Sequence, residues 1–176
     1  MPLIHVDTGA LTYPWFWLPG VVPHFVDGSV PGGAAVSLPA GRYTVQQTRD
    51  HPCDLGFVVT PDGLVEYAAS DDHLLRGRGT TTLHVLGLPV TLTSGGGAPP
   101  LLPMWGGCVE PIRDAVRTVR MPPGRDYALR LGRLSREHLR FSVRRDGVVD
   151  YAAEFETALS GRGTACLTVD PPVARR

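Results

Sequence analysis

The stretch PDGLVEYAA at residues 61–69 returns as RDGVVDYAA at 145–153, and LRGRGTTTLHV at 75–85 returns as LSGRGTACLTV at 159–169. Both repeats have the same offset of 84 residues. At that offset 43 consecutive positions align without a gap, and 18 of them are identical. An internal repeat of this kind predicts two structural units with related folds. Residues shared by the copies then report the fold, whereas residues that only one copy has are candidates for function.

Each copy of the repeat begins with a predicted β-hairpin. Asp62-Gly63 and Asp146-Gly147 suit a type I turn followed by a glycine in the left-handed conformation. A three-residue loop fixes the register, so residues whose numbers sum to 124 face each other in the first copy. Val59 is therefore expected opposite Val65, with the corresponding valines paired in the second copy.

Apolar residues alternate with other residues along both hairpins, which indicates strands with one buried face. Gly and Pro contribute 21 and 17 of the 176 residues, as expected for a protein rich in turns. The sequence predicts a mainly β protein with little helix, built as an internally duplicated antiparallel β-barrel or two-sheet sandwich with pseudo-two-fold symmetry. The predicted halves are residues 1–93 and 94–176, fused into one globular unit, and a strand over 88–93 is expected in the first copy only.

The basic residues of the chain are all arginine, 17 in number, and no lysine or asparagine is present. Schiff-base catalysis and a P-loop lysine are therefore excluded. This composition is typical of a GC-rich bacterial genome. The formal charge is zero overall but is about −4 in the first half and +4 in the second. The densest aromatic group, Trp15, Phe16 and Trp17, lies in the acidic half, so nucleic-acid binding through interleaved basic and aromatic residues is not expected.

The sequence predicts a cytoplasmic protein with no membrane contact. Three cysteines are too few for a disulfide framework, and no apolar stretch of about 20 residues could span a membrane. The N-terminal residues lack the pattern of a secretory signal. No cofactor or metal is predicted, and a monomer is favoured over a homodimer because the duplication already supplies a partner half.

Polar residues gather at the end of the first hairpin away from its turn. Continuing the register places His51 opposite His73 and Cys53 opposite Asp71, all with the odd numbering of the core-facing residues. His51, His73 and Asp71 are therefore candidate acid–base groups. The same cluster has suitable metal ligands, and it is equally compatible with solvated loops. The second copy has different residues at these positions: Ser135, Glu137, Phe155 and Thr157.

A second set of residues is predicted to bind the ligand. Arg49 and Arg133 recur in both copies and could grip a carboxylate by paired hydrogen bonds, or form structural ion pairs. Trp15, Trp17 and Tyr67 are expected to supply apolar walls.

The sequence thus predicts a protein that binds an apolar or weakly anionic small molecule. Its predicted activity, if it has one, is that of a cofactor-independent isomerase, cyclase or hydrolase acting on that molecule. The alternative is a non-catalytic module that binds a protein or a carbohydrate or serves a structural role. The sequence leaves open whether any reaction is catalysed.

Overall fold

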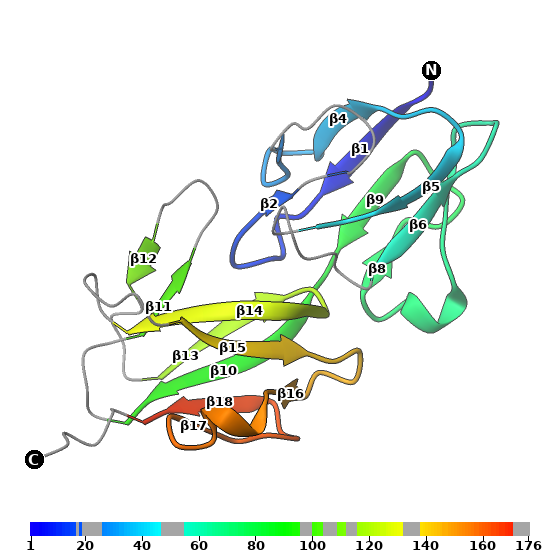
Figure 1. The fold of residues 1–176 in the computed structure, drawn as a ribbon. Coiled ribbons are helices and arrows are strands. Elements are labelled where there is room, and N and C mark those ends of the chain that lie inside the picture. The colour runs from blue at the N-terminus through cyan, green and yellow to red at the C-terminus, as the bar shows by residue number, and fades with distance from the viewer. Residues whose placement is uncertain are drawn as a thin grey trace, which may run out of the picture. The chain divides into compact units, whose positions relative to one another are not determined.

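The computed structural model describes residues 1–16, 18, 26–46, 55–95, 100–103, 109–111, 116–131 and 138–170. Within these residues strands dominate, and the only helical elements are two short 3-10 turns, η1 and η3 (Figure 1). The predicted mainly β class with little helix is therefore confirmed. The chain forms two compact units, Met1–Leu88 with Arg120–Gly124 and Pro89–Val119 with Arg125–Arg176.

The first unit is built from nine short strands in its described part. One sheet has the order β4-β1-β9-β8, a second the order β5-β6-β7, and β2 and β3 form a separate pair. β1 runs antiparallel to β4 and parallel to β9. The elements are β1 (Leu3–Asp7), β2 (Trp15–Phe16), β3 (Val26–Asp27), β4 (Ala34–Ser37), β5 (Gly41–Thr44), β6 (Gly56–Val59), β7 (Val65–Glu66), η1 (Ala69–Asp71), β8 (Leu75–Arg76) and β9 (Thr82–Val85).

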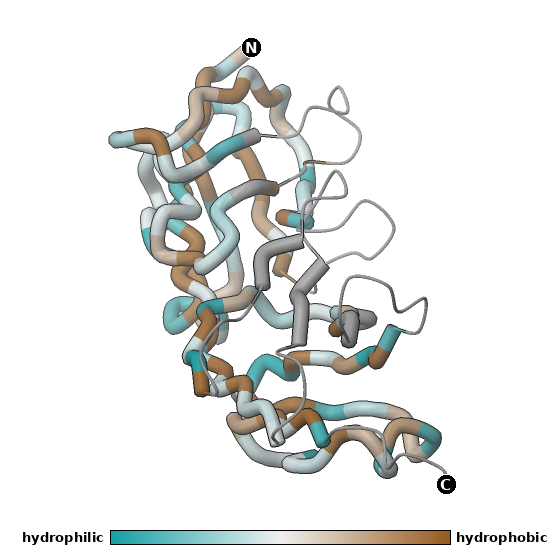
Figure 2. The backbone as a smooth tube through the Cα atoms, turned by 90° about the vertical axis from the view of Figure 1, so that its left-hand side faces the viewer, coloured by the Kyte–Doolittle hydropathy of each residue, from teal (hydrophilic) through white to brown (hydrophobic). Residues whose placement is uncertain are grey.

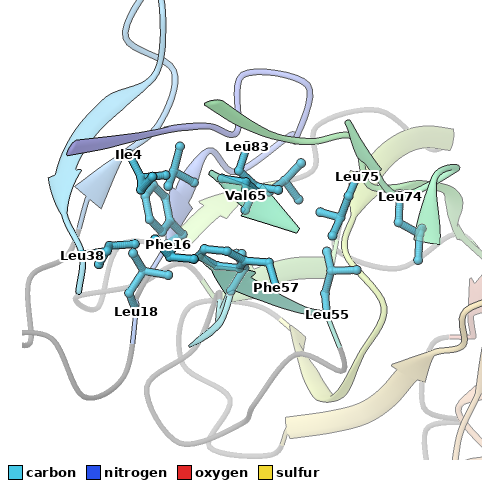
Figure 3. Close-up of a cluster of buried hydrophobic side chains, with 14 of the residues drawn as sticks. Ile4, Phe16, Leu18, Leu38, Leu55, Phe57, Val65, Leu74, Leu75 and Leu83 are labelled. Atoms are coloured by element: carbon cyan, nitrogen blue, oxygen red, sulfur yellow. The ribbon is translucent and has the colours of Figure 1, made fainter. Parts of the chain in front are cut away.

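The core of the first unit joins its two larger sheets. Ile4 and Leu83 come from the sheet that contains β1, and Phe57 and Val65 come from the sheet that contains β6 (Figure 3). Each of these side chains is at most 2% exposed. Burial of such large apolar groups is the dominant favourable contribution to folding. Figure 2 shows the hydropathy of each residue along the backbone, where hydrophobic and hydrophilic residues are interspersed.

The predicted hairpin register is confirmed in both copies. Val59 pairs with Val65 in the first, and Val143 pairs with Val149 in the second. The glycine of the first turn, Gly63, has the predicted positive φ, at 79°. The odd-numbered positions of β6 are buried and the even-numbered ones are partly exposed, as the alternation predicted.

The second unit has two larger sheets in its described part. Their orders are β13-β10-β18-β17 and β12-β11-β14-β15-β16. The elements are β10 (Leu88–Ser94), β11 (Pro100–Pro103), β12 (Val109–Pro111), β13 (Val116–Met121), β14 (Gly124–Leu131), β15 (His138–Val143), β16 (Val149–Asp150), η3 (Ala153–Phe155), β17 (Leu159–Ser160) and β18 (Cys166–Val169).

The strand expected over 88–93 belongs with the second copy, so its assignment to the first copy is wrong. β10 runs parallel to β18, with Leu92 opposite Leu167. β1 runs parallel to β9 in the same way, with Val6 opposite Leu83. All four side chains are at most 1% exposed, so burial of the apolar faces accounts for both pairings.

The repeated segments share their local backbone structure. The amide of Val65 donates to the carbonyl of Thr80 and the amide of Val149 to that of Thr164, each at 2.7 Å. η1 and η3 follow β7 and β16 at the same distance along the chain. Among the described strands, the sheets are open and none of them closes into a barrel.

Candidate functional site

A histidine and an aspartate meet on the outer face of the β4-β1-β9-β8 sheet. Asp7 of β1 lies directly opposite His84 of β9 in the parallel ladder. Their neighbours Val6, Leu83 and Val85 are fully buried, so Asp7 and His84 project from the opposite face. The His84 Nδ1 atom lies 2.8 Å from the Asp7 Oδ2 atom, and the two side chains are 40% and 31% exposed, respectively.

The Asp7 carboxylate holds the imidazole in one orientation. Its Oδ1 atom accepts the amide hydrogen of Gly9 at 2.9 Å, which leaves Oδ2 to accept a hydrogen from His84 Nδ1. When the imidazole is neutral, a donor at Nδ1 makes Nε2 the proton acceptor. A base oriented by a carboxylate in this way is the usual arrangement for proton transfer in enzymes.

The row of ionisable groups continues onto the next strand. Arg76 of β8 lies opposite His84 in the antiparallel ladder, so both side chains leave the same face of the sheet. Leu75, the preceding residue, is 1% exposed, and Arg76 itself is exposed. Asp7, His84 and Arg76 therefore follow one another across three adjacent strands, and we call them the charged row.

In the second unit, residues with hydroxyl groups occupy the ladder positions that correspond to the charged row. Thr93 lies opposite Thr168, and Thr168 lies opposite Ser160, in ladders with the registers of the first unit. The Thr93 Oγ1 atom contacts the Cys166 Sγ atom at 3.7 Å. The charged row is thus a property of one unit only, although the backbone that supports it is present in both.

Sequence reasoning missed the charged row. His84 differs from its counterpart Thr168 at the repeat offset of 84, and so does Arg76 from Ser160, which is a usable signal. Asp7 lies before the ungapped part of the repeat, so only the ladder between β1 and β9 brings it to His84.

The residues predicted from the extended hairpin are placed differently. The paired part of β7 ends at Glu66, and the chain then forms η1, in which the Asp71 amide donates to the Ala68 carbonyl at 2.9 Å. Strand alternation therefore does not extend to residues 71 and 73. Asp71 is 4% exposed, whereas His73 lies exposed in the turn that follows.

Most of the remaining predicted site residues lie outside the described residues: Trp17, Arg49, His51, Cys53 and Arg133. The backbone of Trp15 is described and pairs with Asp27 in the β2–β3 ladder. The proposed grouping of His51 with His73 stays a prediction.

Tyr67 takes part in a contact that closes the Gly-Arg-Gly turn. Its hydroxyl oxygen accepts the amide hydrogen of Arg78 at 3.2 Å, and the Arg78 guanidinium lies over its ring at 5.1 Å from the centroid. The same guanidinium also pairs with Asp72. The Tyr67 hydroxyl is therefore engaged within the fold.

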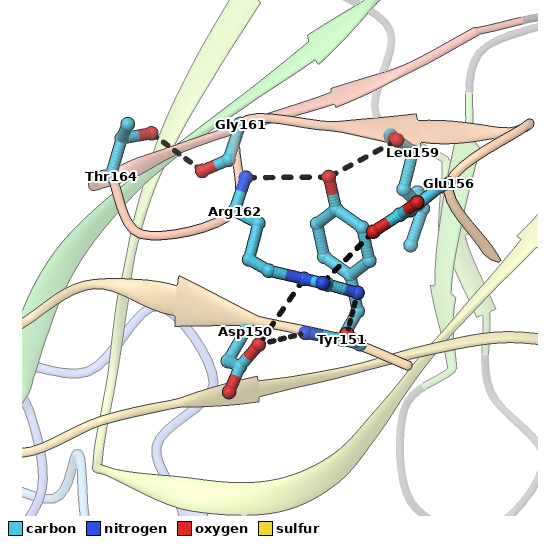
Figure 4. Close-up of polar contacts among 7 residues, drawn as sticks. All are labelled: Asp150, Tyr151, Glu156, Leu159, Gly161, Arg162 and Thr164. Atoms are coloured by element: carbon cyan, nitrogen blue, oxygen red, sulfur yellow. Dashed lines mark hydrogen bonds and ion pairs between the residues drawn. The ribbon is translucent and has the colours of Figure 1, made fainter. Parts of the chain in front are cut away.

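The second unit repeats this contact (Figure 4). The Tyr151 hydroxyl accepts the Arg162 amide hydrogen at 3.3 Å and donates to the Leu159 carbonyl at 3.1 Å. The Arg162 guanidinium lies 4.9 Å from the ring centroid and pairs with Glu156 at 2.9 Å. Because both units make this contact, it stabilises the turn and is not specific to a site in one of them.

Comparisons with known proteins do not assign the chain to a group. No protein-family model matches the sequence, and no curated protein or solved structure matches it significantly. In the described part of the chain, no three His, Cys, Asp or Glu residues come together as ligands for a metal ion. None of the helices among the described residues has the length and apolar character needed to cross a membrane.

Proposed function

We propose that the protein binds a small molecule on the outer face of its first unit and transfers a proton at His84. The observation that carries this proposal is the 2.8 Å contact between His84 Nδ1 and Asp7 Oδ2. With 40% of its side chain exposed, His84 can be reached by a ligand from solvent. The absence of the same pair from the equivalent ladder of the second unit, where Thr93 faces Thr168, supports a role beyond joining the strands.

The two side chains have different roles in this proposal. His84 is the catalytic residue: Nε2 accepts a proton from a carbon next to a carbonyl group, the electron pair of the broken C–H bond moves onto the carbonyl oxygen, and the proton is later returned to the same or a neighbouring carbon. Asp7 is a positioning residue, which fixes the Nδ1–H tautomer and stabilises the imidazolium. Return of the proton to a neighbouring carbon is an isomerisation, whereas return to the same carbon is an exchange with solvent hydrogen, and neither consumes redox equivalents.

The proposal includes a duplicated frame in which one unit is specialised. Three features that the two units share support an origin by duplication of a sandwich-like or barrel-like ancestor. They are the glycine turns, the 3-10 turns, and the parallel ladder that joins β1 to β9 in one unit and β10 to β18 in the other. A monomeric, cytoplasmic protein of bacterial origin remains part of this proposal. In the alternative, a non-catalytic interaction module, the Asp7–His84 pair would serve only to join two strands.

Deuterium uptake by a neutral ketone tests the proposed chemistry. Acetone in D₂O is incubated with the protein, and loss of the methyl proton signal is followed by NMR. We expect His84→Ala to lower the protein-dependent exchange rate about 100-fold, in the range of general base catalysis. Asp7→Asn is expected to lower kcat with little change in KM, because it alters the tautomer and leaves ligand contacts in place.

The control variant is His138→Ala, which removes an exposed histidine of β15 in the second unit. It is expected to keep the exchange rate of the unmodified protein. If His84→Ala exchanged as fast as His138→Ala, the exchange would not depend on His84, and the alternative of a non-catalytic module would then stand.

A further inference from the structure

We infer that Arg76 makes the ligand of this site a small carboxylate with a carbonyl group, such as a 2-oxo acid. The inference rests on the proposed function, because it names the substrate class of the His84 site. Its basis is the charged row: a guanidinium placed on the strand next to an imidazole that a carboxylate already orients.

The β8–β9 ladder sets the distance between the two groups. Arg76 and His84 are directly opposite, so their Cβ atoms lie about 5 Å apart on the same face. The guanidinium can therefore hold one end of a short molecule while the His84 imidazole contacts the other. Arginine suits this task because its planar fork binds both oxygens of a carboxylate at once.

Arg76 differs from the other arginines near it. Arg78 lies over the Tyr67 ring and pairs with Asp72, and Arg120 donates to the carbonyls of Leu86 and Gly87 at 3.1 and 3.0 Å. Within the described residues, the Arg76 side chain forms no hydrogen bond or ion pair. Its guanidinium is thus available to an external anion.

The first unit carries a second exposed strand arginine that serves as a matched control. Arg42 of β5 faces Val58 in its ladder, so its cross-strand neighbour is apolar. Like Arg76 it is exposed, and its side chain forms no hydrogen bond or ion pair within the described residues. If positive charge alone promoted anion binding, replacing either arginine would weaken it. If Arg76 belongs to a specific site, only the replacement of Arg76 would do so.

The mechanism places the carboxylate and the reacting carbon on neighbouring strands. The carboxylate of the 2-oxo acid binds Arg76, and a hydrogen on the carbon beyond the carbonyl faces His84 Nε2. The C–H bond breaks, its electron pair forms the enolate, and the proton passes to Nε2. In D₂O the imidazolium exchanges with solvent and returns deuterium to carbon, so the product differs from the substrate only in its isotope.

The test compares two probes that share a methyl ketone, pyruvate with a carboxylate and acetone without one. Deuterium uptake by each is measured by NMR for the unmodified protein, Arg76→Met and Arg42→Met. We expect Arg76→Met to raise KM for pyruvate and lower kcat/KM about tenfold, with acetone exchange unchanged. Arg42→Met is expected to change neither probe. Equal effects of Arg76→Met on both probes, or no effect on either, would overturn the inference.

A binding measurement separates the failure of this inference from the failure of the proposed function. The protein is titrated with acetate, and the backbone amide shifts of Arg76 and His84 are followed by NMR. Saturable shifts that disappear in Arg76→Met, together with exchange that survives His84→Ala, would leave the carboxylate site standing and refute proton transfer. Exchange that depends on His84, without saturable acetate shifts, would refute the carboxylate site alone.

Discussion

Replacing Gly161 with alanine should destabilise the second unit far more than replacing Gly163. Gly161 has a φ of 100°, and a Cβ atom there would lie 2.0 Å from the carbonyl oxygen of Cys166. That carbonyl already accepts the Thr164 hydroxyl at 2.9 Å, so it cannot move away without losing a hydrogen bond. The unfavourable backbone conformation and the overlap each cost about 1–3 kcal/mol, so we expect a total loss of about 3 kcal/mol or more.

Gly163 is the matched control, two residues further along the same turn. Its φ is 78°, but an added Cβ would meet no atom within 4 Å. Only the left-handed backbone opposes alanine there, at about 1–2 kcal/mol. Both variants are measured by urea unfolding, followed by circular dichroism and fluorescence, with the free energy extrapolated to water.

The reasoning would be refuted if the two alanine variants lost the same stability within about 0.5 kcal/mol, a difference comparable with the error of additive comparisons. The first unit offers an independent repeat of the experiment. A Cβ at Gly77 would lie 1.9 Å from the Thr82 carbonyl oxygen, whereas one at Gly79 would meet its nearest atom, the Glu66 carboxylate, at 4.0 Å. Gly77→Ala should therefore be the more harmful of that pair as well.

Three further predictions concern polar groups. Tyr151→Phe should lower stability in urea unfolding by about 1–2 kcal/mol, and by more than Tyr67→Phe, because the Tyr151 hydroxyl is buried and makes two hydrogen bonds. The pKa of Asp27 is lowered by the Ser29 hydroxyl and then by the Ser29 amide, so an NMR titration should show Ser29→Ala raising that pKa. Since the folded-state pKa is depressed, the stability from Asp27 is present above its unfolded-state pKa and is lost as pH falls through the folded-state value. His84→Ala should cost less than about 1 kcal/mol in urea unfolding, because its ion pair is partly exposed and screened.

The local fold could be predicted from the sequence because it depends on short-range patterns. The register that pairs Val59 with Val65 follows from a three-residue turn and from alternation over a few positions. The alternation argument failed beyond Glu66, where Ala69–Asp71 form a 3-10 turn held by local hydrogen bonds. A run of polar residues after a strand does not distinguish an extended strand from such a turn.

The candidate site could not be found from the sequence because it depends on a long-range parallel ladder. Asp7 and His84 are 77 residues apart, and neither lies in a recognised catalytic motif. The alignment of the two copies does place Thr168 and Ser160 at the positions of His84 and Arg76, a difference that sequence reasoning did not use. It gave no information about which strand lies beside β9, and that neighbour supplies the carboxylate.

The parallel pairing of the first and last strands of each unit also affects the order of synthesis and folding. β1 is made before β9 and can pair with β4, but its other edge stays open until β9 has been made. An unpaired edge on a nascent chain is a site for association with other chains. The paired residues Asp7 and His84 are 77 positions apart, and such non-local pairing makes folding slow, on the order of milliseconds to seconds. The β1–β9 ladder therefore forms only when β9 has been translated, and the β10–β18 ladder only when β18 has, so slow translation near β9 or β18 would prolong the exposed state.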